Sequence, residues 1–240
     1  MSNRDSMINS WFLPEPFYRR EAGFAYPDQA EFICPQAFGR NTYTDERVGS
    51  VIGAMLESIK NPIGRFQWLK ERGFDPGTPN RILAQRCIAL AKFIRPFFDK
   101  SGTVRGHAIV HPVIGQWEVL YTMWLIEPSW YAEHLDILIP IWPPVGKKKW
   151  STRDMMLTAF EITEAHGLRI PLIVAHPEHI QRCFFITRKI FGVAATDSIE
   201  GRTPEEWFDR RSLQKQTTSP GRWLAYEMLA RVHHRLHGWM

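Results

Sequence analysis

The stretch that decides the fold is residues 171–192, PLIVAHPEHIQRCFFITRKIFG. Its first five residues form an apolar run, which predicts a short buried β-strand over 171–175. Pro177 suits the first turn of a helix, and apolar residues then recur at helical spacing until Gly192. A helix is therefore expected over 177–191. A buried strand that leads directly into a helix of this length is half of a βαβ unit.

The same alternation of apolar runs and helical patterns continues on both sides of this stretch. Further strands are predicted at residues 31–39, 107–112, 135–142 and 193–196. Helices are predicted at residues 45–60, 64–72, 81–98, 117–124, 151–166 and 220–237. The strands are apolar throughout, which indicates a sheet that is buried on both faces. We therefore predict an α/β fold, a doubly wound, mostly parallel Rossmann-like sheet with helices on both faces.

The chain is predicted to form one domain that follows an arm. Residues 1–30 contain three prolines and several aromatic side chains, so we expect an irregular N-terminal arm packed on the body. Residues 31–240 show no internal repeat and no linker. They are expected to form a single Rossmann-like α/β domain with a helical insertion around 41–80. Its last helix is expected to be amphipathic, with apolar residues Trp223, Leu224, Met228, Leu229, Val232 and Leu236.

The composition is that of a folded protein, with 44% hydrophobic and 23% charged residues and a formal net charge of +5. The longest stretch without Asp, Glu, Lys or Arg is residues 106–117, too short to span a bilayer. With no signal-peptide pattern at its start, the chain is expected to be cytoplasmic and to have no membrane partner. Such a mild charge does not predict nucleic-acid binding. Reduced thiols are expected for the three widely spaced cysteines, Cys34, Cys87 and Cys183.

The candidate site lies at the carboxyl ends of the predicted strands, because doubly wound sheets bind ligands where the strand order switches. The residues that follow these strands mix cations, hydroxyls, imidazoles and a carboxylate, a set that suits an anionic or nucleotide-like small molecule. Glu118 and His179 are the predicted catalytic residues, and a surface role for Glu118 stays open. The predicted ligand-binding residues are Gly39, Arg40, Gly115, Ser151, Thr152, His176 and Arg182.

Two of these segments have a defined local chemistry. Ser151-Thr-Arg-Asp154 matches the capping-box pattern, which is either a plain helix cap or an anion cradle helped by Lys147–Lys149. His179 and Arg182 are three residues apart, so they share one face of their helix. His176, His179 and Cys183 could in principle bind zinc, but no fourth ligand and no H-E-x-x-H pattern accompany them, and no metal site is predicted.

Tryptophan is unusually frequent, with ten in the chain and five of them within residues 117–150. Two interpretations are open. The side chains can be core or interface residues, as large aromatic residues usually are. Alternatively, Trp142 and Trp150 can form a stacking wall for a planar ligand, since they flank a loop at a strand end.

Four segments resemble the SanA/YdcF-like family, a Rossmann-like domain of poorly defined function. They are Phe38-Gly39-Arg40, Gly115-Gln-Trp-Glu118, Ser151-Thr152-Arg-Asp154 and the stretch from Ala175 to Arg182. The likeness covers roughly residues 31–238, although the family's Ser-Gly-Gly turn is replaced here by His111-Pro-Val-Ile-Gly115. Without a membrane anchor, the chain looks like the soluble YdcF-like branch. The resemblance implies a cytoplasmic domain that binds a nucleotide-like or S-adenosylmethionine-like ligand, and it supplies no reaction.

Three functional hypotheses follow from these observations. The first is a small-molecule enzyme or binding protein with an anionic or nucleotide-like ligand, for which S-adenosylmethionine or a nucleotide is the candidate cofactor. The second is a tailoring enzyme of a specialised pathway with a Trp-lined pocket. The third is a non-catalytic interaction protein or an obligate dimer, for which a homodimer is the candidate assembly. The sequence leaves open whether the protein is an enzyme.

Overall fold

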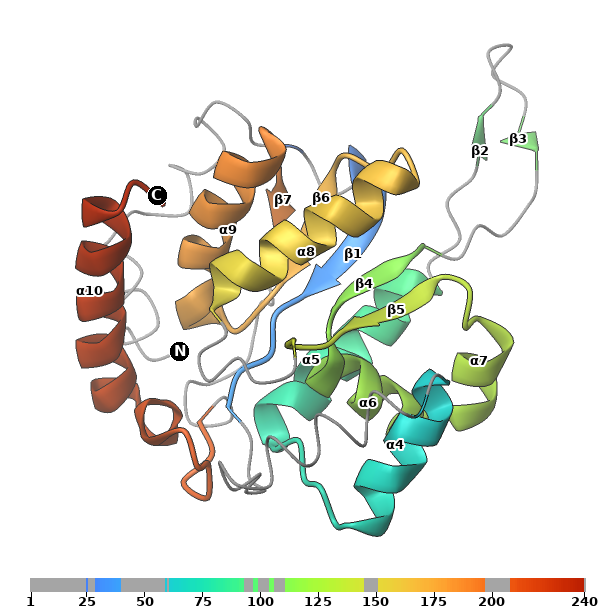
Figure 1. Ribbon diagram of the computed structural model, residues 1–240, viewed down its shortest axis with the longest axis horizontal. Helices are drawn as coiled ribbons and strands as arrows, with labels where there is room; N and C mark the ends of the chain where they lie inside the picture. The colour runs from blue at the N-terminus through green and yellow to red at the C-terminus, as the bar shows by residue number, and fades with distance from the viewer. Residues whose placement is uncertain are drawn as a thin grey trace.

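A five-stranded, all-parallel sheet forms the centre of the molecule (Figure 1). The computed structural model describes residues 25, 29–39, 59, 61–92, 97–98, 104–105, 111–144, 151–196 and 208–239. The strands have the order β5-β4-β1-β6-β7. Their bounds are Phe32–Pro35 for β1, Val113–Gln116 for β4, Leu138–Ile141 for β5, Pro171–Val174 for β6 and Ala195–Thr196 for β7. This confirms the predicted doubly wound, parallel α/β fold.

Helices cover both faces of this sheet (Figure 1). One face is covered by α5 (Thr78–Ala91) and α6 (Trp117–Ile126), with α4 (Pro62–Glu71) and α7 (Pro128–Glu133) packed beside them. The other face is covered by α8 (Thr152–Ala165) and α9 (Pro177–Phe191). The 3₁₀ helix η3 (Lys215–Thr218) leads into the last helix, α10 (Pro220–Leu236), which lies outside α9. No helix among the described residues is both long enough and apolar enough to cross a membrane.

The strand side chains explain why each strand is apolar along its whole length. Within β1, Ile33 packs on the side of α5 and α6, whereas Phe32 and Cys34 pack on the side of α8. The neighbouring strand β4 divides in the same way, with Val113 on one side and Ile114 on the other. Successive strand residues point to opposite faces, and both faces are buried here, so no position in a strand favours a polar residue.

Most helices lie where their patterns predict them. The predicted helices at 151–166, 177–191 and 220–237 correspond to α8, α9 and α10. The turn after α8 depends on Gly167, whose φ of 71° lies in the left-handed region that glycine adopts without strain.

Two predicted elements are wrong in their bounds. The second strand was expected over 107–112, but β4 begins only at Val113. Pro112 lies directly before the strand, where its missing N–H breaks no ladder bond, so it does not terminate the strand. The helix expected over 81–98 ends at Ala91, and Phe97–Phe98 form a short strand, β2, antiparallel to β3 (Val104–Arg105). Aromatic residues favour such extended segments.

The amphipathic terminal helix also differs from expectation. Trp223 is buried, as its place in the apolar pattern suggests. Leu224 is half-buried. The remaining apolar residues of the pattern are exposed to solvent, namely Met228, Leu229, Val232 and Leu236. Several expectations lie outside the described residues: nearly all of the arm at 1–30, most of the helix at 45–60, and Arg40, Lys147–Lys149 and Trp150.

Candidate functional site

The candidate site is built where β1 and β6 end side by side in the sheet. Along the chain, β1 is followed by α4 and α5 on one face, and β6 is followed by α9 on the other face. This divergence is the switch in strand order at which open α/β sheets bind ligands. The first turn of α8 and the inner side of α10 complete the surroundings, through contacts described below.

An aromatic cluster fills the space directly beyond these two strands. The His176 ring stacks on Phe38 with ring centroids 3.7 Å apart and an interplanar angle of 13°. Phe208 meets His176 edge-on at 4.9 Å, and Trp223 of α10 meets Phe38 at 4.5 Å. His176 is fully buried. These contacts give His176 a packing role at the place where the sequence predicted a ligand-binding residue.

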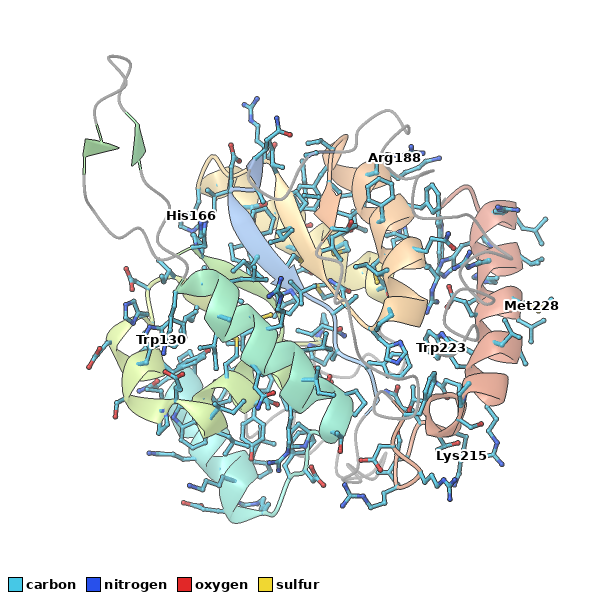
Figure 2. All side chains as sticks on the ribbon, turned by 180° about the vertical axis from the view of Figure 1, so that it is seen from behind. Trp130, His166, Arg188, Lys215, Trp223 and Met228 are labelled. Carbon is cyan, nitrogen blue, oxygen red and sulfur yellow. The ribbon has the colours of Figure 1, made fainter. Side chains whose placement is uncertain are left out.

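A polar cluster lies next to the aromatic one, between α9 and α10. We call it the α9–α10 polar cluster, and it consists of His179, Arg182, Glu227, Arg231 and His234, all of them buried. Figure 2 shows Trp223 on the side of α10 that faces α9. Glu227 and Arg231 are buried on the same helix, and Glu227 reaches Arg182 of α9.

His179 is held as a neutral imidazole with a defined tautomer. Its Nδ1 lies 3.0 Å from Arg182 Nη2, and a guanidinium can only donate, so Nδ1 accepts this hydrogen bond. The proton therefore sits on Nε2, which lies 3.5 Å from the hydroxyl oxygen of Thr152 in the first turn of α8. Burial, with the positive charge of Arg182, lowers the pKa of His179 well below its usual value.

Glu227 is the single carboxylate of the α9–α10 polar cluster, and it pairs with two arginines. Its Oε2 lies 3.1 Å from Arg182 Nε, and its Oε1 accepts a hydrogen bond of 3.0 Å from Arg231 Nε. Two buried guanidinium groups thus share this one carboxylate. His234 Nδ1 is buried without a hydrogen-bond partner. Burial and the nearby Arg182 lower the pKa of His234 to about 4.

These two histidines predict that the protein loses stability in mild acid. Unfolding releases each imidazole to an ordinary pKa of about 6.5, so the unfolded chain binds more protons as pH falls below that value. Each histidine then lowers the free energy of unfolding by up to about 1.4 kcal/mol per pH unit between about pH 6.5 and 4.5. The measurement is urea unfolding at several pH values in that window.

The matched variants for this pH experiment are His234→Gln and His166→Gln. His166 is exposed at the end of α8, so His166→Gln is the control for replacing a histidine outside the α9–α10 polar cluster. His234→Gln removes one titrating group and should make the dependence shallower. Equal slopes for His234→Gln and the wild type would show that His234 does not resist protonation in the folded protein.

The glycines predicted to bind a ligand pack against protein atoms instead of an open space. A Cβ on Gly39 would lie 2.7 Å from Thr217 Oγ1 and 3.0 Å from Ser212 Oγ, and the φ of Gly39 is +72°. A Cβ on Gly115 would lie 2.5 Å from Cδ of Pro35. Close packing accounts for both glycines.

The remaining predicted residues are only partly brought together. Ser151 forms a complete capping box with Asp154, so its hydroxyl is engaged at the start of α8. Thr152 and Arg182 both contact His179. Glu118 lies in the first turn of α6, on the other face of the sheet, and none of the contacts described for it leads to His179.

Several residues of the site had no signal in the sequence. Asn80 lies in the first turn of α5, whose cap position is Gly77. The buried Asn80 amide accepts a hydrogen bond from Phe38 N and donates to Gly39 O and Pro76 O, which fixes the loop after β1. Glu227, Arg231 and His234 also went unpredicted, because only the packing of α10 on α9 brings them to the site.

The tryptophan-rich segment forms core rather than a pocket wall, as far as the described residues reach. Trp142 stacks on Trp117 of α6 with ring centroids 4.8 Å apart and an interplanar angle of 10°. Arg65 and Phe66 of α4 pack against Trp142 from another side. These contacts favour the interpretation of the tryptophans as packing residues.

Within the described residues, no three His, Cys, Asp or Glu side chains come together as metal ligands would. Comparisons with protein-family models, with curated proteins and with solved structures give no match to this chain.

Proposed function

We propose that this protein binds a small ligand carrying a phosphate or carboxylate group at the carboxyl edge of its sheet, beside the α9–α10 polar cluster. The observation that carries the proposal is Arg182, a buried guanidinium whose polar contacts are the neutral His179 ring and the Glu227 carboxylate, which is also shared with Arg231. A buried guanidinium favours an anionic partner. A bound phosphate or carboxylate beside Arg182 would supply one.

The position of the cluster supports the same proposal. Arg182 lies one turn into α9, which starts directly after β6 at the switch in strand order. Thr152 brings the first turn of α8 to the same place through His179. Gln36, which follows β1 and is fully buried, has a side-chain oxygen without a hydrogen-bond partner and adds an acceptor for a ligand donor.

The tautomer of His179 favours binding over acid–base catalysis at this residue. A general base must have a free nitrogen to accept a proton. His179 Nδ1 already accepts from Arg182, and Nε2 carries the proton. We therefore assign His179 a donor role through Nε2–H. Glu118 remains a candidate catalytic carboxylate only if a ligand extends from the α9–α10 polar cluster to α6.

The proposal also includes the SanA/YdcF-like resemblance and a cytoplasmic location for the protein. A SanA/YdcF-like domain would be expected to take a nucleotide-like or S-adenosylmethionine-like ligand. A cytoplasmic location is supported by Cys34, Cys87 and Cys183, which are buried and form no disulfide.

The test is a thermal-shift screen with inorganic phosphate, AMP and S-adenosylmethionine. A ligand at 100 times its dissociation constant stabilises the folded state by about 2.7 kcal/mol, which raises Tm by roughly 5–10 °C for a chain of this size. We expect the phosphate-bearing probes to raise Tm and S-adenosylmethionine, whose one anionic group is a carboxylate, to show whether phosphate is required. Calorimetric titration of each stabilising probe then gives its affinity.

Arg182→Gln and Arg188→Gln are the matched pair of variants for the titration. Both residues lie on α9, but Arg188 is in its last turn and far from the switch in strand order. The charge-assisted bonds of Arg182 predict that Arg182→Gln weakens the affinity at least about tenfold, while Arg188→Gln leaves it unchanged. Equal losses in both variants, or no stabilising probe at all, would refute the anion site.

A further inference from the structure

Three sulfur atoms from two elements meet in the core near the end of β1. Cys34 is the third residue of β1, and Met155 and Met156 lie in the first half of α8. All three side chains are fully buried, and Cys34 Sγ lies 3.8 Å from Met156 Sδ. We call these three residues the sulfur cluster. Thiol and thioether sulfurs are polarisable, so the sulfur cluster is a set of potential ligands for a soft metal ion.

The side-chain amide of Gln36 lies among these sulfurs, and core packing alone does not account for it. Its Nε2 lies 3.2 Å from Met156 Sδ, 3.7 Å from Cys34 Sγ and 3.9 Å from Met155 Sδ. These sulfurs are weak hydrogen-bond acceptors. The Oε1 atom of Gln36 is buried without a hydrogen-bond partner. A fully buried amide with such poor partners costs free energy, so this place suits an amide only if something else also binds there.

We propose that the sulfur cluster binds one copper(I) ion, with Cys34 as a thiolate ligand and Met155 and Met156 as thioether ligands. Sulfur ligands of these two kinds favour copper(I) over harder divalent ions. A zinc–thiolate bond is about 2.3 Å long, and with bonds of this length two ligating sulfurs stand roughly 3.8–4.0 Å apart at a tetrahedral or trigonal angle. The distance of 3.8 Å between Cys34 Sγ and Met156 Sδ has this value, so these two sulfurs already have the spacing of ligands.

The Gln36 amide marks the place of the ion, because its Nε2 lies within 3.9 Å of all three sulfurs. When copper(I) binds, the amide turns aside and loses only its contacts with weak acceptors. The turn can bring Oε1 to the metal as a weak further ligand, a position that glutamine takes in some copper sites. Cys34 gives up its thiol proton to water as the copper–sulfur bond forms, so each bound ion releases one proton and no oxidation state changes.

Competition with the chromophoric copper(I) chelator bicinchoninate, in the presence of ascorbate, tests the site. The wild type should take one copper(I) ion per chain from the chelator. Cys34→Ser should weaken the affinity at least about 100-fold and Met156→Leu at least about tenfold, since even a partner outside the ligand set of a metal site contributes about 10–100-fold. Leucine has nearly the volume of methionine, so Met156→Leu keeps the core filled and the variant folded.

Cys87→Ser and Met123→Leu are the matched controls. Cys87 lies on α5 and Met123 on α6, so both are buried on the other face of the sheet from α8. Both controls should bind copper(I) as the wild type does. A wild type that takes no copper(I) from the chelator overturns the proposal, as do equal losses in the controls and in the variants of the sulfur cluster.

X-ray absorption of the copper-loaded protein tests the ligands independently. Scattering from sulfur is expected in the first shell, and scattering from imidazole would assign the ion to histidines and overturn the proposal. The copper site and the anion site can be told apart, although Gln36 lies near both. Arg182→Gln should leave copper(I) affinity unchanged, and Cys34→Ser should leave phosphate affinity unchanged. Loss of copper(I) binding alone therefore refutes the sulfur site and leaves the anion site standing.

Discussion

Glu227→Gln should lower the free energy of unfolding by about 3–5 kcal/mol, the cost of removing one partner from a buried ion pair. The substitution keeps the size and shape of the side chain but removes its charge. Arg182 and Arg231 then lose the negative charge that lies 3.1 and 3.0 Å from their Nε atoms, and one of them faces an amide NH2, which cannot accept its hydrogen bond. A folded domain is stable by only about 5–15 kcal/mol, so this one change removes a large share. Urea unfolding at pH 7.5 measures it.

The control for Glu227→Gln is Glu133→Gln, which changes an exposed carboxylate of α7. Its effect should stay within about 0.5 kcal/mol. If unpaired buried charge is the cause, adding Arg182→Gln and Arg231→Gln to Glu227→Gln should recover part of the lost stability. A loss below about 1 kcal/mol for Glu227→Gln would mean that water reaches the two guanidinium groups, and the buried cluster would have to be abandoned.

The fold could be predicted because its evidence is local. The strand at 171–175 and the helix at 177–191 are each coded by residues within one element, and the capping box at Ser151 marks the start of the next helix. Buried parallel strands are apolar on both faces, so the doubly wound arrangement follows from the strands themselves. The boundary error at β4 also has a local cause, since Pro112 can end one strand or precede another.

The site could be predicted only in part, because half of it comes from a distant helix. His179 and Arg182 follow from their place after β6. Glu227 is 45 residues further along the chain than Arg182, and nothing in the sequence of α10 indicates that its charged side faces inward. The apolar residues Leu229, Val232 and Leu236 of that helix would suggest the opposite orientation. The orientation of α10 is set by tertiary packing, because Glu227 on its polar side forms an ion pair with Arg182 of α9.

The glycines after the strands are ambiguous in the sequence for a related reason. A glycine that follows a strand is compatible with close approach of a ligand and with close approach of protein atoms. Gly39 and Gly115 were predicted to contact a ligand. The neighbouring atoms belong to Thr217 and Pro35, which lie 178 and 80 residues away along the chain. Only the three-dimensional structure separates these two explanations.

Gly115→Ala should lower the free energy of unfolding by about 3 kcal/mol, at the upper end of the usual cost of overpacking. The added Cβ would lie 2.5 and 2.7 Å from Cδ and Cγ of Pro35, and 2.7 Å from its carbonyl oxygen. A proline ring and a backbone carbonyl in a central strand cannot turn away as the end of a long side chain can. Thermal and urea unfolding measure the loss.

The reason for this crowding is the proline in the central strand. Pro35 has no N–H to donate, and β1 and β4 are in register only at Ile33 and Val113. Beyond that point the Gln116 side chain accepts a hydrogen bond from Ala37 N, which keeps the two strands together around the ring. Gly115 leaves the space that the ring occupies. A side chain at this position would push β4 away from β1 at the edge where the candidate site is built.

Gly221→Ala is the matched control for Gly115→Ala, since a Cβ there meets nothing within 4 Å. Gly221 lies in the first turn of α10, where alanine favours the helix, so this variant should be as stable as the wild type or up to about 1 kcal/mol more stable. The two variants carry the same chemical change, but only Gly115→Ala should lower the free energy of unfolding. Gly115→Ala could instead keep wild-type stability and lose affinity for phosphate or AMP. That result would place Gly115 in the ligand site and show that Pro35 can shift away from the added Cβ without loss of stability.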